Sequence, residues 1–338
     1  MIQDVIRNQA ALERLIEVCR SQRSIAVTGA GLSWWAGYRT WNELIDQLAE
    51  RVRERRGDEV NVDAILRNYR DRLLCAQKLA AELGPRGEFE DFIRAEFGPV
   101  APRDRSVLQT FARIPFRDVI TFNFEESAER SYEGATLPCR SISSANDREL
   151  IRYLRQLDQP QTHRHVVHAH GKYSDPQGRI VLTEEEYGAL YRPGGFFKNF
   201  LWSIFASRTL VFFGCGFEDS DFVGCLREAG RDLRLPEMCH LAVVGLGADQ
   251  DDRERRTHFN NAYLIEPIFY EIGPDHSHQG FVETLQTLAE AANPQAQAGQ
   301  NDAAGNVPGP PRHDLEIVER LGMKFMGVAD FGGDDVPR

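Results

Sequence analysis

Two residues that could take part in catalysis, Asn123 and His170, each lie at the end of a short apolar run. The runs are DVITFN (118–123) and HVVHAHG (165–171), and both are typical of buried β-strands. A side-chain amide suits ribose hydroxyls or a positioned water, and an imidazole titrates near neutrality and can accept a proton. Each residue also has a structural interpretation, Asn123 as the N-cap of the next helix and His170 as a hydrogen-bonded polar residue at a strand end. The pair becomes a catalytic candidate if the fold brings the two strand ends together.

Glycine-rich segments follow two further apolar runs. Gly29-Ala30-Gly31-Leu32-Ser33 follows IAV (25–27), and Gly214-Cys215-Gly216 follows RTLVFF (208–213). Glycine has no Cβ, so a nucleotide phosphate can approach the backbone, and the N–H groups that come next can bind an anion. The first segment lacks the third glycine of the usual dinucleotide fingerprint, because Trp34 takes its place. Tight structural turns are therefore the alternative interpretation of both segments.

Acidic residues, histidines and cysteines give no pattern of a metal site. Asp219 and Asp221 follow the second glycine segment, where they could bind ribose hydroxyls or cap the next helix. His168 and His170 straddle the end of their strand, and no cysteine or carboxylate stands beside them at ligand spacing, so we expect no zinc or other metal. The six cysteines form no CxxC pair and lie mostly in apolar stretches, which predicts buried free thiols in a reducing compartment.

Composition and charge exclude several classes of protein. The chain has 338 residues, of which 42% are hydrophobic and 27% charged, as in ordinary globular proteins. Its formal net charge of -11 argues against a general nucleic-acid or membrane-surface binder, because both classes are usually basic. Residues 1–20 carry charges throughout, unlike a signal peptide, and no later stretch has the length of a membrane span. The sequence therefore predicts a cytoplasmic protein with no direct contact to nucleic acid or membrane.

Strands and helices alternate along most of the chain. Further expected strands are RIVL (179–182), CHLAVV (239–244) and IFYEI (268–272), and helical patterns lie at 147–157, 196–206, 220–233, 250–262 and 279–291. Apolar strands that alternate with helices predict an α/β fold with a Rossmann-like, mostly parallel sheet and helices on both faces. Helical patterns fill about 42–100, between the first two strands, and predict an inserted helical subdomain instead of a standard crossover.

The composition changes after Ala292. Residues 293–312 are rich in Gly, Pro, Gln, Asn and Ala, which is typical of a flexible linker. Residues 313–338 again contain regularly placed apolar side chains, which predicts an element that docks on a domain or mediates oligomerisation. We therefore divide the chain into a catalytic domain at 1–292, a linker and a C-terminal segment.

Taken together, these segments resemble the sirtuin family, and more closely the divergent sirtuin-like domains of bacterial anti-phage defence proteins. The resemblance covers about residues 15–290 and depends on several motifs in the family's order. They are Gly29-Ala30-Gly31-Leu32-Ser33 with Gly37 and Trp41, Thr121-Phe122-Asn123-Phe124-Glu125, His170-Gly171, IVLTEEEY (180–187), and Gly214-Cys215-Gly216-Phe217 with Asp219 and Asp221.

The resemblance implies that NAD is bound at the carboxyl edge of the sheet. It implies that Asn123 and His170 lie beside the nicotinamide ribose, where Asn123 orients the ribose or a water and His170 accepts a proton. The implied NAD contacts are Gly29, Ala30, Gly31, Ser33, Trp41, Thr121, Gly214, Gly216 and Asp219.

Departures from the family pattern bear on the reaction. Deacylating sirtuins carry two zinc-binding CxxC pairs, which this chain lacks, and their Gly-Ile-Pro-Asp-Phe-Arg loop reads Gly37-Tyr38-Arg39-Thr40-Trp41-Asn42 here. Glu125 also replaces the family's aspartate. These changes weaken the case for an acyl-lysine site and leave the NAD chemistry intact. We therefore expect an NAD glycohydrolase that releases nicotinamide and ADP-ribose; a protein deacylase or ADP-ribosyltransferase and a non-enzymatic nucleotide-binding scaffold are the alternatives.

An enzyme that consumes NAD would be toxic if it were always active. The resemblance therefore implies NAD depletion during phage infection, known as abortive infection, under the control of assembly. The expected partners are further copies of the chain and a defence protein such as a HerA-type ATPase or an Argonaute-like protein.

Overall fold

The computed structural model describes residues 2–69, 72–175, 180–217, 220–232, 240–275 and 277–293, which belong to a compact unit spanning Met1–Gln300. Asp219, Cys239, the predicted C-terminal segment and all but the first residue of the predicted linker lie outside the described residues. None of the described helices combines the length and the apolar character needed to cross a bilayer.

One sheet of seven parallel strands, in the order β3-β4-β2-β1-β5-β6-β7, forms the centre of this unit. The strands are β1 (Ile25–Thr28), β2 (Asp118–Thr121), β3 (Cys139–Ser143), β4 (Arg164–His168), β5 (Leu210–Phe213), β6 (His240–Leu246) and β7 (Ile265–Glu271). Every residue of β1, β2 and β5 is buried, as expected for parallel strands covered on both faces. The predicted α/β fold with a Rossmann-like sheet is confirmed.

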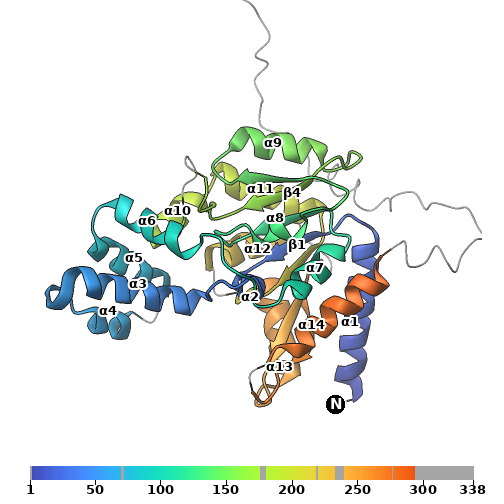
Figure 1. Cartoon of the computed structure of the whole chain (residues 1–338). Coiled ribbons are helices and arrows are strands. Elements are labelled where there is room, and N and C mark those ends of the chain that lie inside the picture. The colour runs from blue at the N-terminus through green and yellow to red at the C-terminus, as the bar shows by residue number, and fades with distance from the viewer. Residues whose placement is uncertain are drawn as a thin grey trace, which may run out of the picture. The chain divides into compact units, whose positions relative to one another are not determined.

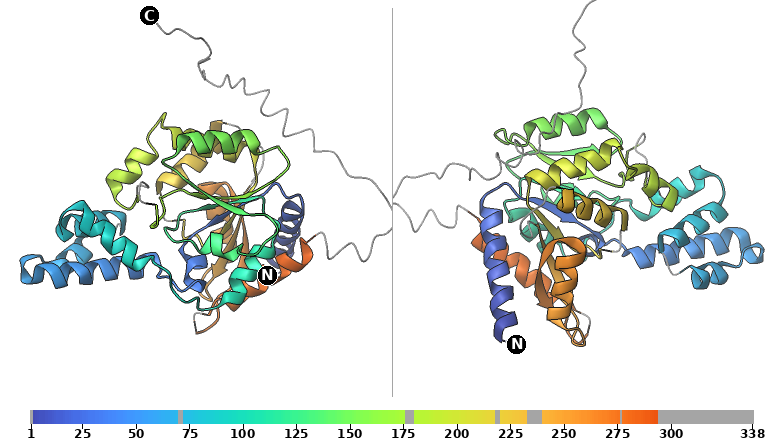
Figure 2. Two further views of the ribbon diagram at one scale, coloured as in Figure 1. Left: turned by 45° about the horizontal axis from the view of Figure 1, so that its top comes forward. Right: turned by 180° about the vertical axis from the view of Figure 1, so that it is seen from behind.

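Helices cover the sheet on both sides. In Figure 1, α7 (Arg105–Arg113) and α14 (Gln279–Ala291) lie in front of it, with α1 (Ile2–Arg20) against α14. From behind, in the right panel of Figure 2, α11 (Phe196–Ser207) and α12 (Ser220–Asp232) lie in front. The other described helices around the sheet are α2 (Ala30–Trp35), α8 (Ser127–Ser131), α9 (Asp147–Gln156), α10 (Glu184–Leu190), α13 (Asp252–His258) and a π-helical turn, η2 (Phe259–Tyr263).

Between β1 and β2, four helices gather on one side of the molecule, at the left in Figure 1. They are α3 (Trp41–Arg56), α4 (Val62–Asn68), α5 (Arg72–Leu83) and α6 (Arg86–Glu96), with a 3-10 turn, η1 (Gly57–Glu59), after α3. Helix α3 begins at a capping box in which the Thr40 hydroxyl and the Glu43 carboxylate satisfy each other's backbone N–H groups. We call these four helices the helical insert.

Two expectations about strands differ from the structure. Cys139–Ser143 is a strand, β3, that the sequence analysis did not predict, because it is a partly exposed edge strand in which Arg140, Ser141 and Ser143 are polar. Residues 180–182 were expected within a strand but lie outside the sheet. Their apolar side chains are buried, and the backbone N–H of Val181 donates to the carbonyl of His170 (2.9 Å), so they pack at the strand ends without joining the ladder.

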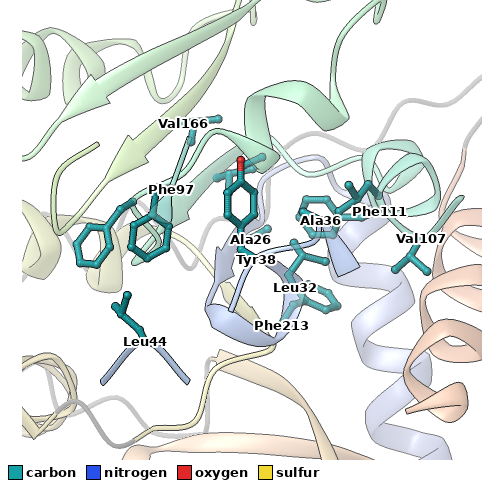
Figure 3. Close-up of a cluster of buried hydrophobic side chains, with 14 of the residues drawn as sticks. Ala26, Leu32, Ala36, Tyr38, Leu44, Phe97, Val107, Phe111, Val166 and Phe213 are labelled. Atoms are coloured by element: carbon teal, nitrogen blue, oxygen red, sulfur yellow. The ribbon is translucent and has the colours of Figure 1, made fainter. Parts of the chain in front are cut away.

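Aromatic side chains form the core beneath the loops that follow the strands (Figure 3). The ring of Phe111, on α7, lies 5.7 Å from that of Phe213 on β5, and Tyr38 stacks on Phe97 with ring centroids 6.2 Å apart. Phe97 in turn meets Phe124 edge to face at 5.1 Å. These contacts pack α7 on β5 and hold the segments after β1 and β2 together through Phe97, because each aromatic pair adds to the apolar burial.

Candidate functional site

A pocket of about 770 Å³ lies where the loops after β1, β2 and β5 meet. Cofactor pockets typically have volumes of about 300–1,000 Å³, and in open parallel sheets they lie at the carboxyl ends of the strands. Of the predicted site residues, the pocket wall contains Gly29, Ala30, Ser33, Trp41, Asn123, His170 and Gly216. Gly31, Thr121 and Gly214 are described but are not part of this wall, and Asp219 lies outside the described residues.

The glycines pack two loops against each other. A Cβ added to Gly29 would lie 2.6 Å from the carbonyl oxygen of Gly214, and one on Gly31 would lie 2.8 Å from the Gly214 Cα. Gly214 has a φ of +63°, and its own Cβ would meet the backbone nitrogen of Leu32 at 2.5 Å. The backbone N–H of Gly31 donates to the Gly214 carbonyl (2.9 Å). The missing side chains of Gly29, Gly31 and Gly214 therefore make room for the opposite loop, and Gly29 and Ala30 also line the pocket.

Asn123 is held in one orientation beside the first glycine loop. Its side-chain Nδ2 donates to the carbonyl oxygen of Gly29 (3.0 Å), and its backbone N–H donates to the hydroxyl of Thr121 (3.1 Å). Because a carbonyl oxygen can only accept, this contact fixes the amide nitrogen toward the loop. Thr121, buried at the end of β2, thus positions Asn123 without lining the pocket.

A buried carboxyl lies behind the wall formed by Ser33. The Ser33 hydroxyl donates to one oxygen of Glu125, and the backbone N–H of Ser127 donates to the other. Glu125 is 1% exposed, and burial raises its pKa above the usual range despite these hydrogen bonds. The longer side chain, where the sirtuin pattern has aspartate, connects α2 to the loop after β2.

His170 lies deeper and is more enclosed than the sequence indicated. It is 3% exposed, its ring stacks on Phe122 with centroids 5.2 Å apart, and its Nε2 and Nδ1 lie 2.9 Å and 3.1 Å from the hydroxyls of Tyr191 and Tyr187. Burial lowers the pKa of His170 from 6.5 to about 3. The expectation that this imidazole titrates near neutrality is therefore wrong, because the enclosed site disfavours its charged form.

Sequence reasoning missed the two tyrosines and two arginines. Tyr187 and Tyr191 stand four residues apart in and directly after α10, a spacing that places both on one helix face, and Tyr187 also lines the pocket. Arg39 and Arg72 line the pocket as well, and Arg72 comes from α5 of the helical insert. The tyrosine spacing was readable in the sequence, whereas nothing near Arg72 indicated that it would reach the loops after the strands.

Two further features bear on the chemistry. In the described part of the chain, no group of three or more His, Cys, Asp or Glu residues is arranged to hold a metal ion. Cys215, also in the pocket wall, is a half-buried thiol that forms no disulfide, and its Sγ lies 3.6 Å from the carbonyl oxygen of Val27. The polar groups of the pocket wall are thus two amides, an indole N–H, an enclosed imidazole, hydroxyls, a thiol and two guanidinium groups, together with backbone.

Comparison with known protein families matches residues 117–268 to the SIR2-like domain, a match that includes both Asn123 and His170. The chain is also similar to the uncharacterized protein y4cA of Sinorhizobium fredii, with 27% identity over 169 residues. The aligned region is 46% of this chain and 14% of that relative, so the chain spans a small part of the relative's length. SIR2-like domains use NAD. Residues 117–268 therefore match a SIR2-like domain, and the sirtuin-like resemblance indicated by the motifs is confirmed.

Proposed function

We propose that this protein hydrolyses the bond between nicotinamide and ribose in NAD, with nicotinamide and ADP-ribose as products. The observation that carries the proposal is that Gly29, Asn123 and His170, which lie far apart in the sequence, line one pocket at the carboxyl edge of the sheet. The SIR2-like match over two of these residues supports NAD as the substrate.

The arginines and the first glycine loop suit the diphosphate of NAD. Gly29 and Ala30 line the pocket, and because Gly29 has no side chain a diphosphate can approach the backbone of the first glycine loop closely there. Arg39 forms an ion pair with Glu96 (3.4 Å) and its side chain is 45% exposed, while Arg72 approaches the same pocket from α5. Guanidinium groups bind phosphate oxygens well because their donors form a planar fork.

Bond cleavage needs no general acid, because nicotinamide already leaves from a cationic nitrogen. Positive charge develops at the anomeric carbon, as in glycoside hydrolysis, and water then attacks that carbon. Because the Nδ2–H of Asn123 donates to the carbonyl oxygen of Gly29, its amide oxygen can accept a hydrogen bond from a ribose hydroxyl or from the attacking water. Asn123 is thus the residue that we assign to orient the reacting groups.

His170 takes part as a neutral imidazole. At pH 7 its lowered pKa keeps it uncharged and makes it a weak base, so we assign it to orient the reacting groups through a hydrogen bond at its unprotonated ring nitrogen and not to take up a proton. Both of its ring nitrogens face tyrosine hydroxyls, and of the two only Tyr187 is part of the pocket wall. Tyr187 is therefore the hydroxyl through which we expect His170 to meet the substrate.

The biological role is also part of the proposal. We propose that NAD depletion by this chain serves bacterial anti-phage defence, that the chain acts as a homo-oligomer, and that a HerA-type ATPase or Argonaute-like partner controls it. The support is the family resemblance together with the toxicity of unregulated NAD loss.

The test is to incubate the purified protein with NAD, alone and with the product of a neighbouring gene, and to measure nicotinamide and ADP-ribose by chromatography. Asn123→Ala should lower kcat by about 10² to 10⁴. The control Asn199→Ala, at an exposed position on α11, should leave kcat unchanged. The deacylase alternative would be established instead if nicotinamide release required an acyl-lysine peptide and metal analysis found one zinc per chain.

A further inference from the structure

Residues 180–191 wrap around His170. The backbone N–H of Val181 donates to the His170 carbonyl (2.9 Å), and Tyr187 and Tyr191 meet the two ring nitrogens. The backbone carbonyl and both ring nitrogens of His170 are thus contacted from one short piece of chain, which consists of the irregular residues 180–183, α10 and Tyr191. The orientation of the imidazole therefore depends on where this piece of chain lies.

One carboxylate, Glu186, holds the turn at the start of α10. Its Oε2 accepts hydrogen bonds from the backbone N–H groups of Leu182 and Thr183, each at 3.0 Å, and completes a capping box with Thr183. The side chain is 8% exposed, so its charge is largely removed from water. A buried carboxylate of this kind needs an opposite charge close by.

That charge comes from the helical insert. Arg86, on α6, places Nη1 2.6 Å from Glu186 Oε1, and its Nη2 donates to the carbonyl oxygen of Ile180 (3.0 Å). The guanidinium also lies 5.0 Å from the ring centroid of Phe89 and contacts Glu90 at 3.4 Å. Arg86 thus holds both ends of the turn 180–186 and is itself fixed on α6.

We propose that Arg86 is a positioning residue for His170: through Ile180 and Glu186 it holds α10 where Tyr187 and Tyr191 fix the imidazole at the pocket. The helical insert thereby contributes to the reacting end of the site without touching substrate there. Arg86 is not part of the pocket wall. Its effect should consequently appear in the rate of the chemical step and not in the affinity for substrate. This inference rests on the proposed NAD cleavage for its kinetic test.

The sharpest variant is Glu186→Gln. The glutamine oxygen can still accept from Leu182 and Thr183, so the helix cap is retained, while the amide nitrogen now faces Arg86 and the ion pair is lost. Arg86→Ala removes the same contact from the other side. Arg86→Lys keeps the charge without the guanidinium fork whose two nitrogens reach Glu186 and Ile180 separately. The control is Arg94→Ala, on the same helix, whose partners Glu90 and Asp91 lie outside the 180–191 segment.

Glu186→Gln and Arg86→Ala should lower kcat by about 10- to 100-fold, as small misplacements of catalytic groups do, with KM for NAD changed by less than about twofold. Arg86→Lys should recover part of kcat, and Arg94→Ala should match the wild type. A wild-type kcat in both Glu186→Gln and Arg86→Ala, or a change confined to KM, would overturn the proposal. Should Arg86→Ala fail to fold, Glu186→Gln and Arg86→Lys still decide the question.

A second readout does not depend on activity. In protein labelled with ¹⁵N-histidine, the His170 ring nitrogens, assigned with a His170→Asn variant, should report one neutral tautomer in the wild type and tautomer averaging in Glu186→Gln. Unchanged His170 signals in Glu186→Gln would mean that Arg86 does not position the ring. If the wild type releases no nicotinamide from NAD, the proposed reaction fails, and these spectra alone decide the role of Arg86.

Discussion

Lowering the pH from 7 to 5 is expected to weaken the folded state through two histidines that are buried without charge. Burial lowers the pKa from 6.5 to about 3 for His170 and to about 4 for His240. In His240 the geometry gives a further reason, because Nδ1 accepts a hydrogen bond from the backbone N–H of Leu210 (3.2 Å) and so carries no proton. An unfolded chain protonates both imidazoles as the pH falls below 6.5, whereas the folded chain does not.

The size of the effect follows from proton linkage. Each such histidine reduces the free energy of unfolding by about 1.4 kcal/mol per pH unit below 6.5, which amounts to about 2 kcal/mol at pH 5. The pair therefore contributes a loss of about 4 kcal/mol, a large part of a typical stability of about 5–15 kcal/mol. The loss is absent above pH 6.5, grows as the pH falls, and levels off below pH 4 for His240 and below pH 3 for His170.

Urea unfolding followed by circular dichroism at pH 7 and pH 5 measures this loss. His240→Asn retains an acceptor for the Leu210 N–H and should reduce the difference in unfolding free energy between the two pH values by about 2 kcal/mol. His163→Asn, at an exposed histidine, is the control and should leave the difference unchanged. If His240→Asn and the wild type lose the same free energy of unfolding between pH 7 and pH 5, the conclusion that His240 is buried in its neutral form is wrong.

Three further outcomes follow from the site. Because the His170 imidazole is already neutral at pH 6, kcat for NAD cleavage should show no protonation step between pH 6 and 7.5, and a step near 6.5 that His170→Asn removes would contradict this. Arg72→Ala should raise KM for NAD by about 10-fold in steady-state assays, as expected for the loss of one charged hydrogen bond. Lys78→Ala, at an exposed lysine of the same helix, is the control and should leave KM unchanged. In thermal unfolding, Gly214→Ala should lower the free energy of unfolding by about 1–3 kcal/mol, because Gly214 has a positive φ and close backbone contacts. Gly224→Ala, within α12 and with open space where a Cβ would lie, should raise the free energy of unfolding by about 1 kcal/mol. The same change in stability for both variants would contradict the proposed packing of the glycine loops.

Much of the fold could be predicted from the sequence, because strands buried on both faces must be apolar throughout. β1, β2 and β5 are of this kind, and their neighbouring helices have clear apolar faces. Parallel strands also place their carboxyl ends on one edge, so the residues after them were reasonable site candidates. β3 escaped prediction because an edge strand has no such apolar requirement.

The sequence by itself determined the α/β class, the helical pattern between β1 and β2, and the polar residues at the strand ends. Only the tertiary structure decided that Gly29 and Asn123 would be joined by a hydrogen bond across 94 residues. It also decided that, from the helical insert, Arg72 would reach the pocket and Arg86 would contact Ile180 and Glu186. It also decided the protonation of His170, since the removal of water by Phe122 and the α10 tyrosines depends on contacts between segments. Periodicity records which faces are buried, but desolvation and pairing between distant segments exist only once the chain has folded.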